Sequence, residues 1–329
     1  MSPVISVIIP IYNAERRLNN IFSQLSKQSL DNKYFEIIFV NDGSKDQSEK
    51  IIQDFIVDKT NYHLLNQENK KQAEARNNGI RNAKGNYLLF VDDDDVLDSN
   101  YLKTFYNNAC GYNIVFSGIK KTFPNGEEIE ENTVLHDYKY DDKSSVLNSY
   151  LVRGKESDSG VWAKMYRREF IKENNIFFDN ENFFEDSLFN FKALLAADLS
   201  TITTIDYYGY RLIKHCNTTT NSFHSELDYL VDSYISKIRY LLSANNLSKI
   251  KMESFIDREF VYVVHHHIKF DTYDSSKKIS QKLKIKNVFD KLLPLKYKVS
   301  ILMMKISFPL YYFVYKYRNS RLFRGEKNV

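Results

Sequence analysis

The chain of 329 residues has little cysteine and lacks several short motifs on which common protein classes depend. Its two cysteines, Cys110 and Cys216, do not have the paired spacing of a disulfide framework or a thiolate zinc site. No two of its ten glycines stand two positions apart, so the G-x-G-x-x-G dinucleotide motif is absent. The G-x-x-x-x-G-K-S/T phosphate loop and the H-E-x-x-H zinc motif are absent as well. A nucleotide, if bound, is therefore held in another way.

Long hydrophobic runs are also missing. The first thirteen residues lack the basic start and the apolar core of a signal peptide. The aromatic and apolar stretch at residues 299–317 is interrupted by Lys305 and Pro309, and it falls short of the roughly 20 apolar residues that a membrane-spanning helix needs. We therefore expect a globular protein in a reducing, cytoplasmic setting.

The net charge of +4 is unevenly distributed along the chain. Residues 277–329 contain fourteen Lys or Arg and two acids and carry +12, whereas residues 1–276 carry −8. A basic, aromatic segment of this kind is typical of a helix on the anionic inner face of a membrane, with Tyr311 and Tyr312 at the headgroup level. The alternative is a packing or oligomerisation helix with a solvated basic edge. No nucleic-acid-binding motif accompanies the charge. The basic cluster consists of Lys316, Arg318, Arg321 and Arg324.

The first hundred residues alternate between strand and helix patterns. Buried strands are predicted at residues 4–9, 36–40, 62–65 and 87–91, and helices with apolar faces follow the first three strands. This alternation predicts a largely parallel sheet with helices on its faces, and ligands of such sheets bind beyond the carboxyl ends of the strands. Polar clusters follow three of these ends, so we expect them to meet on one edge of the sheet.

The pattern changes after residue 100. Residues 113–117 read as a strand, residues 124–126 as the turn of a hairpin, and residues 159–166, 186–199 and 201–211 as strand, helix and strand. From residue 224 onward the chain reads as helical, which predicts an α/β domain over 1–220 and a helical region over 221–329. The consecutive histidines 265–267 suggest a metal site, but neighbouring residues of a helix point in different directions, which favours stacked or capping histidines.

Four consecutive aspartates, residues 92–95, follow the fourth predicted strand. Alternate residues of an extended loop project to the same side, so Asp92 and Asp94 can face one pocket while Asp93 and Asp95 face elsewhere. Mg²⁺ and Mn²⁺ prefer oxygen ligands, and Mg²⁺ is usually bound by one or two carboxylates together with substrate phosphates. The run therefore indicates a site for a metal and a diphosphate, and a solvated turn with an acidic helix cap is the alternative.

Five ordered sequence blocks resemble the large inverting glycosyltransferase family 2 over about the first 210 residues. The resemblance implies a GT-A fold, a Rossmann-like α/β domain with a mostly parallel mixed sheet that binds a nucleotide-diphosphate sugar and a divalent metal. The blocks are SVIIPIYN at 6–13, FVNDGSKD at 39–46, ARNNG at 75–79, GNYLLFVDDDD at 85–95 and FED at 184–186.

The resemblance also assigns roles to individual residues. Asp42 matches the acid that contacts the nucleobase, Asp94 is preferred to Asp92 as the direct metal ligand of the D-x-D motif, and Asp186 matches the catalytic base. Each residue has an alternative role: Asp42 in a turn, Arg76 in a surface ion pair, Trp162 in the core, and Glu185 with Asp186 at a helix N-terminus. The further donor-binding residues are Pro10, Tyr12, Arg76, Asp92 and Asp93, and the residues near the sugar and acceptor are Trp162, Lys164 and Glu185.

The implied activity is a metal-dependent transfer, with inversion, of a hexosyl or N-acetylhexosaminyl group. The donor is a nucleotide sugar of the UDP type, and the acceptor is a hydroxyl group of a growing bacterial surface glycan, which is lipid-linked in some systems of this kind. The alternative is an inactive sugar-binding or scaffolding subunit, which we would expect to have lost the D-x-D or the Glu-Asp pair; both are retained.

Overall fold

The computed structural model describes residues 4–136, 140–180, 183–214 and 223–322. The chain forms two compact units. The first consists of Met1–Lys121, Ile129–Tyr138 and Lys155–Ile213, and the second of Thr122–Glu128, Lys139–Gly154 and Lys214–Val329. The boundary expected near residue 220 lies outside the described residues, and so does Cys216.

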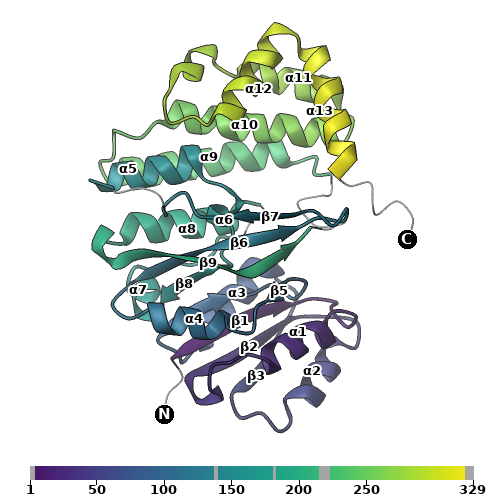
Figure 1. The fold of residues 1–329 in the computed structure, drawn as a ribbon, viewed down its shortest axis with the longest axis vertical. Coiled ribbons are helices and arrows are strands. Elements are labelled where there is room, and N and C mark those ends of the chain that lie inside the picture. Colours follow the sequence, from purple (N-terminus) through teal and green to yellow (C-terminus); the bar gives the residue numbers. More distant parts are fainter. Residues whose placement is uncertain (1–3, 137–139, 181–182, 215–222, 323–329) are drawn as a thin grey trace. The chain divides into compact units, whose positions relative to one another are not determined.

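A mixed nine-stranded sheet forms the centre of the first unit, with the strand order β3-β2-β1-β4-β8-β6-β9-β5 and β7 paired to β6 (Figure 1). Strands β1 to β4 are parallel, whereas β8 pairs antiparallel with β4 and β6, and β5 pairs antiparallel with β9. This arrangement confirms the expected α/β class. The strands are β1 (Ile5–Ile11), β2 (Phe35–Asp42), β3 (Tyr62–Gln67), β4 (Tyr87–Phe90), β5 (Val96–Leu97), β6 (Ile114–Thr122), β7 (Glu128–Glu131), β8 (Lys164–Arg167) and β9 (Ile202–Ile213).

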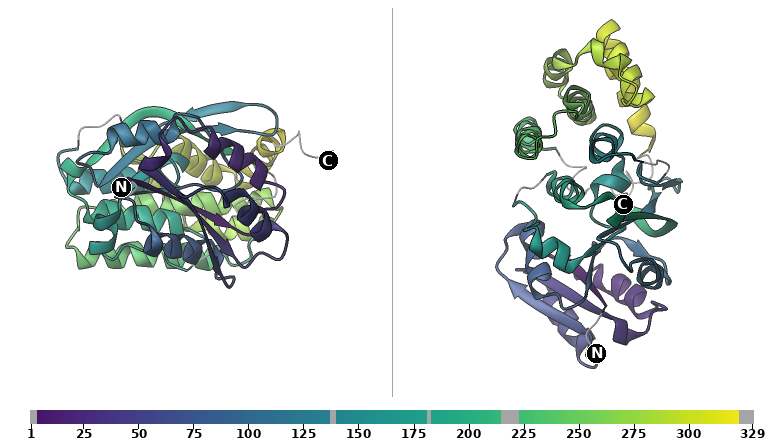
Figure 2. Two further views of the ribbon diagram at one scale, coloured as in Figure 1. Left: turned by 90° about the horizontal axis from the view of Figure 1, so that it is seen from below. Right: turned by 90° about the vertical axis from the view of Figure 1, so that its left-hand side faces the viewer.

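Strand β1 is buried along its whole length because helices cover both of its faces, and all of its residues except Ser6 are apolar (Figure 2). Its odd-numbered residues pack with the buried side chains of α1 (Leu18–Ser26), and α2 (Ser48–Ile56) joins the same core through the stacked rings of Phe22 and Phe55. On the other face, α3 (Lys71–Asn82) approaches so closely that a Cβ at Gly79 would lie 2.4 Å from Cγ2 of Ile8. This close packing fixes the position of α3 on the sheet.

The register of the parallel strands brings their carboxyl ends together. Ile11 of β1 lies opposite Asn41 of β2, and Ile8 lies opposite Phe90 of β4. The strand order reverses between β1 and β4, which is where parallel α/β sheets bind their ligands. The polar segments after β1, β2 and β4 therefore follow strands that end at one edge of the sheet, as the sequence predicts.

The strand predicted at residues 159–166 is only partly correct, because β8 begins at Lys164. Ser159 ends the short helix α6 (Glu156–Ser159), and residues 160–163 form a bend and a turn. Buried polar groups cause the difference. The carboxylate of Asp158 accepts hydrogen bonds from Thr133 Oγ1 and the backbone N–H groups of Val134 and Lys155. These bonds hold the chain in a turn that an apolar pattern does not reveal.

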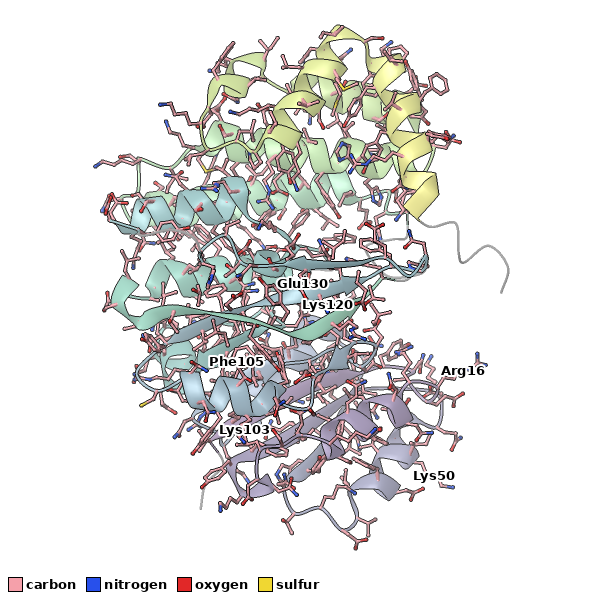
Figure 3. All side chains as sticks on the ribbon, in the orientation of Figure 1. Arg16, Lys50, Lys103, Phe105, Lys120 and Glu130 are labelled. Carbon is pink, nitrogen blue, oxygen red and sulfur yellow. The ribbon has the colours of Figure 1, made fainter. Side chains whose placement is uncertain are left out.

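The predicted hairpin at residues 124–126 is confirmed. Phe123 donates its backbone N–H to the carbonyl of Glu127, and Gly126 closes the turn with φ +83°. Across the strands, Lys120 and Glu130 form an ion pair at 3.2 Å (Figure 3). The remaining helices among the described residues of the first unit are α4 (Tyr101–Asn108), α7 (Arg168–Glu173), α8 (Glu185–Ala196) and the 3₁₀ helices η1 (Asn32–Tyr34) and η3 (Leu199–Thr201).

The described part of the second unit is mainly helical. The apolar faces of its two longest helices supply much of its core, with Val231 and Ile238 on α9 and Phe255 and Val264 on α10. No helix among the described residues is long and apolar enough to cross a bilayer. The helices are α5 (Lys143–Asn148), the π-helix η2 (Ser149–Arg153), α9 (Leu227–Ala244), α10 (Met252–Lys269), α11 (Tyr273–Lys282), the 3₁₀ helix η5 (Ile285–Phe289), α12 (Leu295–Ile306) and α13 (Phe308–Leu322).

The three histidines of α10 have separate partners. Nε2 of His265 lies 2.6 Å from the hydroxyl of Tyr311, and Nε2 of His267 lies 2.9 Å from Oδ1 of Asp228. The ring of His266 packs 4.9 Å from that of Phe270. The side chains diverge, in agreement with the stacked or capping role favoured by the sequence.

We predict that Gly79→Ala destabilises the protein by about 1–3 kcal/mol, because the new methyl group overpacks the fully buried Ile8. In an unconstrained helix the same change would stabilise by about 1 kcal/mol. In an Ile8→Ala background, which removes the clashing atoms, Gly79→Ala should be neutral or stabilising. Urea unfolding of the unaltered chain, the two single variants and the double variant measures the coupling energy between Gly79 and Ile8. An equal loss of stability from Gly79→Ala in both backgrounds would contradict the prediction.

Candidate active site

The loops after β1 and β2 are tied to each other by reciprocal hydrogen bonds. The backbone N–H of Asn13 donates to Ser44 Oγ at 3.0 Å, and Asn13 Oδ1 accepts the N–H of Lys45 at 2.8 Å. The N–H of Ala14 donates to Ser48 Oγ at 2.8 Å. Such bonds fix this part of the sheet edge before any ligand binds.

Two of the residues expected at the nucleotide pocket lie beside these loops. Pro10 is buried within β1, and Tyr12 directly follows the strand with 45% of its surface exposed. An aromatic ring exposed next to a rigid loop offers a flat surface on which a base or ribose can pack.

Asp42 is buried at the end of β2 and joins this strand to the segment that enters α3. Its Oδ1 accepts hydrogen bonds from Gln67 Nε2 at 2.7 Å and from the N–H of Lys70 at 2.8 Å. The next residue, Gly43, has φ +69°, and a Cβ there would lie 2.8 Å from the backbone nitrogen of Asn69. Asp42 therefore ties the end of β2 to β3 and to the start of α3, and it lies at the edge of the sheet where the nucleobase contact is predicted.

Arg76 of α3 connects two acids that are far apart in the sequence. Its Nη2 lies 2.9 Å from Oδ1 of Asp92, and its Nη1 lies 2.6 Å from Oδ1 of Asp186. The side chain is 1% exposed, so the alternative of a surface ion pair is wrong. Burial acts to lower the pKa of Arg76, but the carboxylates of Asp186 and Asp92 outweigh it and raise that pKa. The guanidinium is therefore a fixed positive charge between two carboxylates.

Asp186 and Glu185 occupy the first turn of α8. The residue before them, Phe184, has φ +65°, a strained conformation for a bulky side chain that occurs most often where function requires a particular backbone path. Burial raises the pKa of both carboxyl groups, Asp186 adds to the rise for Glu185, and Arg76 opposes it for both. A carboxylate with a raised pKa at a rigid helix start is suited to accepting a proton.

The four consecutive aspartates do not share one environment. Asp92 accepts from Arg76, and Asp93 accepts from Nη2 of Arg17 at 2.8 Å. Asp95 is 1% exposed and accepts from the hydroxyl of Tyr210 at 2.6 Å. Burial raises the pKa of Asp93 to about 6, and burial also raises the pKa of Asp95 well above its ordinary value. The side chains of these three aspartates are thus directed to three different partners, which separates their charges.

Tyr210 of β9 is a site residue that the sequence analysis missed. Its hydroxyl donates to Asp95 and accepts the backbone N–H of Asp92 at 3.2 Å, so it holds both ends of the acidic run. Its ring stacks on Trp162 at 5.5 Å. Tyr210 lies 115 residues from Asp95, and no short motif could have revealed the contact.

Trp162 and Lys164, expected near the sugar and acceptor, are both buried. Lys164 Nζ donates to the carbonyls of Ser157 at 2.6 Å and Gly160 at 2.5 Å, and burial lowers the pKa of Lys164 to about 8. Trp162 packs against Tyr210, as its core alternative predicts. In this structure Trp162 contacts the tyrosine that holds the acidic run, and Lys164 is bonded to the backbone just before Trp162.

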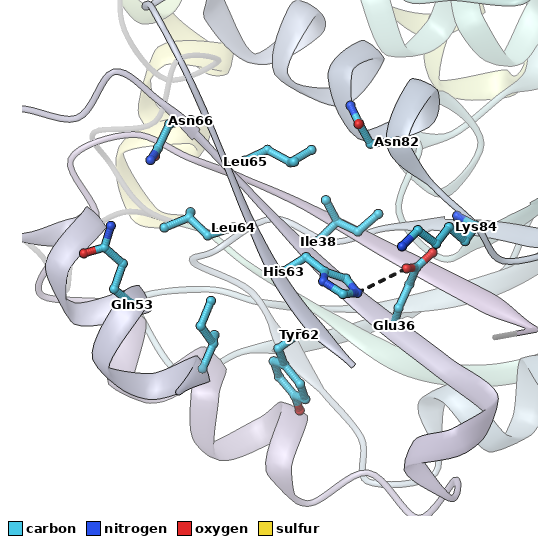
Figure 4. Close-up of a pocket in the computed structure, with 11 residues that line it drawn as sticks. Glu36, Ile38, Gln53, Tyr62, His63, Leu64, Leu65, Asn66, Asn82 and Lys84 are labelled. Atoms are coloured by element: carbon cyan, nitrogen blue, oxygen red, sulfur yellow. Dashed lines mark hydrogen bonds and ion pairs between the residues drawn. The ribbon is translucent and has the colours of Figure 1, made fainter. Parts of the chain in front are cut away.

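A separate surface cavity of about 490 Å³ lies over β2 and β3 (Figure 4). His63 and Glu36 form an ion pair within it at 3.4 Å, and Lys84 also lines it. None of the lining residues belongs to the predicted site. This cavity is therefore distinct from the candidate active site.

The acidic run has the donor types that a hard cation prefers, but it does not form a complete cage. Among the described residues, no group of three or more His, Cys, Asp or Glu side chains is arranged to hold a metal ion. The two predicted ligands, Asp92 and Asp94, are nevertheless enough for an ion whose other ligands are phosphate oxygens and water. The residues fit a metal that binds together with a diphosphate.

Comparison with known proteins identifies the family. The profile described as Glycosyl transferase family 2 matches residues 6–174. The chain belongs to this family. It is 31% identical over 223 residues to "Uncharacterized glycosyltransferase EpsJ" of Bacillus subtilis (strain 168), which covers 64% of this chain and 62% of EpsJ. It is 25% identical over 268 residues to "Poly(ribitol-phosphate) beta-N-acetylglucosaminyltransferase TarS" of Staphylococcus aureus (strain Mu50 / ATCC 700699), which covers 80% of this chain and 44% of TarS. Both alignments span less than two thirds of the relative's length.

Solved structures show the same GT-A fold. The crystal structure of S. aureus TarS 1–349 in complex with UDP-GlcNAc matches with a TM-score of 0.59 at 19% identity, covering 97% of this chain and 92% of that chain. The mannosyltransferase PcManGT from Pyrobaculum calidifontis, in complex with GDP-Man and Mn²⁺, matches with a TM-score of 0.51 at 13% identity. The match covers 98% of this chain and 85% of the PcManGT chain. The chain thus belongs to Glycosyl transferase family 2 and has the GT-A fold.

We predict that Arg76→Gln lowers the free energy of unfolding by about 3–5 kcal/mol, because it leaves Asp92 and Asp186 without their shared counter-charge. Adding Asp92→Asn and Asp186→Asn should restore much of the loss. The matched control is Arg81→Gln on the same helix, whose exposed pair with Glu74 should contribute at most about 1 kcal/mol. Urea unfolding compares the variants. Equal losses for Arg76→Gln and Arg81→Gln would refute the bridging role.

Proposed function

We propose that this family 2 enzyme transfers a hexosyl or N-acetylhexosaminyl group, with inversion, from a UDP-linked donor to a hydroxyl group of a bacterial surface glycan. The observation that carries the proposal is the single buried guanidinium of Arg76 between Asp92 and Asp186. This guanidinium links Asp92, an acid of the predicted metal and diphosphate site, to Asp186, the predicted catalytic base. TarS is a poly(ribitol-phosphate) beta-N-acetylglucosaminyltransferase and has been crystallised with UDP-GlcNAc, and both facts support the proposed classes of donor and acceptor.

Asp186 is proposed to take the proton from the acceptor hydroxyl as that oxygen attacks the anomeric carbon opposite the leaving diphosphate. Arg76 holds one oxygen of this carboxylate, Oδ1, and so sets its orientation. Glu185 lies next to Asp186, and it is proposed to lie near the sugar and acceptor together with Trp162 and Lys164.

At the other side of Arg76, Asp94 and Asp92 are proposed to hold a divalent metal, with Asp94 as the direct ligand. When bound, such an ion offsets the charge that develops on the leaving diphosphate. Pro10, Tyr12 and Asp42 are proposed to contact the nucleoside, and Asp93 to stay beside the phosphates through its contact with Arg17. The complex of PcManGT with Mn²⁺ supports the choice of metal.

The alternative of an inactive sugar-binding or scaffolding subunit makes a different prediction. Such a subunit would bind UDP-sugar without turnover, whereas the proposed enzyme releases UDP. Incubation with a panel of nucleotide sugars and Mn²⁺ or Mg²⁺, followed by assay of free UDP, separates the two. Stabilisation by a donor without release of UDP, in the presence of isolated surface glycan as acceptor, would favour the scaffold.

We expect Asp186→Asn to reduce transfer by a factor on the order of 10² to 10⁴ while donor affinity stays nearly unchanged, because the amide keeps the shape but cannot accept the proton. Asp198→Asn, which changes an exposed carboxylate beyond the other end of α8, is the control and should leave the rate unchanged. Transfer rate and donor affinity are measured separately. If Asp186→Asn lost donor affinity and rate equally, Asp186 would be structural.

We expect Asp94→Asn to abolish donor turnover and to remove any increase in melting temperature that Mn²⁺ gives with UDP, because an amide is a poorer ligand for a hard cation. Asp98→Asn, an exposed acid just after the run, is the control. Thermal unfolding with UDP is recorded with Mn²⁺ and with a chelator. Full metal-dependent turnover by Asp94→Asn would exclude this ligand assignment.

A further inference from the structure

Helix α12 exposes a continuous apolar stripe. Leu295, Val299, Leu302 and Ile306 recur at intervals of four, three and four residues, which places them on one side of the helix. All four are exposed, Ile306 to 84%, whereas the opposite side of α12 buries Ile301 and Met304. A soluble helix normally exposes polar residues on the side away from the core, so this stripe requires an explanation.

Helix α13 exposes a second apolar stripe. Leu310, Phe313, Val314 and Tyr317 follow the i, i+3, i+4, i+7 spacing of one helix side, and all are exposed. Phe289 of η5, just before α12, is 84% exposed as well. The two neighbouring helices therefore both direct large apolar side chains away from the core of the second unit.

Two of the tyrosines that the sequence analysis expected at a membrane surface are not exposed in the structure. Tyr311 and Tyr312 are buried, so the prediction that they lie at a membrane headgroup level is wrong. The hydroxyl of Tyr311 contacts His265 at 2.6 Å, and that of Tyr312 donates to Asp271. These two tyrosines attach α13 to the rest of the unit and leave the other side of the helix outward.

The same segment is strongly basic. Residues 285–319 contain seven Lys or Arg and one acid, Asp290. Lys296, Lys298 and Lys305 belong to α12 itself. Lys316 is already paired with the carboxylate of Asp271 at 2.6 Å, whereas Lys305 donates to the uncharged backbone carbonyl of Gln281 at 3.2 Å. The α12 lysines are therefore the better candidates for contact with an external anion. Of the other members of the predicted basic cluster, Arg318 is exposed on α13. Arg321 and Arg324 provide no structural argument, because the side chain of Arg321 and all of Arg324 lie outside the described residues.

The positive charge of this segment distinguishes between two candidate partners for the exposed apolar surface. A second copy of the chain, related by a two-fold axis, would bring the same basic segment against itself, and like charges facing each other at an interface are unfavourable. An anionic lipid surface instead offers negative headgroups for the lysines and an acyl boundary for the apolar stripes. We propose that the exposed faces of α12 and α13 dock on an anionic membrane surface, with their apolar side chains in the interface and the α12 lysines at the headgroups.

Two variants test the two contributions. Leu295→Ser, Val299→Ser, Ile306→Ser and Phe313→Ser combined remove much of the apolar stripe, and binding to anionic vesicles should weaken on the order of 100-fold or more. Lys296→Gln, Lys298→Gln and Lys305→Gln combined should weaken it on the order of 100-fold, since each lysine near such a surface contributes about fivefold. The salt dependence of binding should fall only in the lysine variant.

Exposed residues elsewhere supply matched controls. Val57→Ser, Tyr229→Ser and Tyr240→Ser remove equally exposed apolar side chains outside the two helices, and Lys27→Gln, Lys50→Gln and Lys103→Gln remove exposed lysines of the first unit. Both controls should bind vesicles as the unaltered chain does. All variants should keep its melting temperature, because the substituted residues are at most partly buried.

The measurement is co-sedimentation of the full chain with vesicles of phosphatidylglycerol and phosphatidylcholine, and with phosphatidylcholine alone, at about 0.1 and 1 M salt. The expected result is binding to the anionic vesicles that decreases at high salt. No binding by the unaltered chain, or equal losses in the control variants, would overturn the proposal. Sedimentation velocity adds a second criterion: a dimer that only the stripe variant dissociates would assign the surface to a subunit interface instead.

Discussion

The candidate active site depends on the buried guanidinium of Arg76. Without a positive charge between them, the carboxylates of Asp92 and Asp186 would repel each other and lose part of their hydration. A buried charge without a partner is strongly destabilising. Arg76 supplies the opposite charge at 2.6 Å from Asp186 and 2.9 Å from Asp92. It therefore connects the end of β4 to the start of α8, and the predicted donor side of the reaction to the predicted acceptor side.

The same principle explains how the chain tolerates four adjacent aspartates. Asp92, Asp93 and Asp95 contact Arg76, Arg17 and Tyr210, which lie on three different elements. Each contact directs one carboxylate toward a partner of its own and also fixes the path of the loop. The run is thus held rigidly before a donor arrives, and such preorganisation reduces the cost of positioning a diphosphate.

The sequence predicted the features that arise from local periodicity. The parallel strands β1 to β4, the hairpin at residues 124–126 and the helical second unit follow from apolar spacing and turn residues. The contacts of Arg76 with Asp186 and of Tyr210 with Asp95 span 110 and 115 residues, and no local pattern encodes them. The short helix α6 was missed for a related reason, because the buried carboxylate of Asp158 determines it through partners at residues 133 and 134.

The C-terminal segment shows how packing selects among residues of similar composition. Residues 308–317 are almost uniformly aromatic and apolar, so composition alone does not distinguish Tyr311 and Tyr312 from Phe313 and Val314. Successive residues of a helix are rotated by about 100°, and only one side of α13 can pack on α10 and α11. The hydroxyl groups of Tyr311 and Tyr312 find polar partners in His265 and Asp271, whereas the opposite side consists mainly of the apolar Leu310, Phe313 and Val314. The pairing of polar atoms thus determines which side packs inward, and the side left outward is apolar and flanked by lysines.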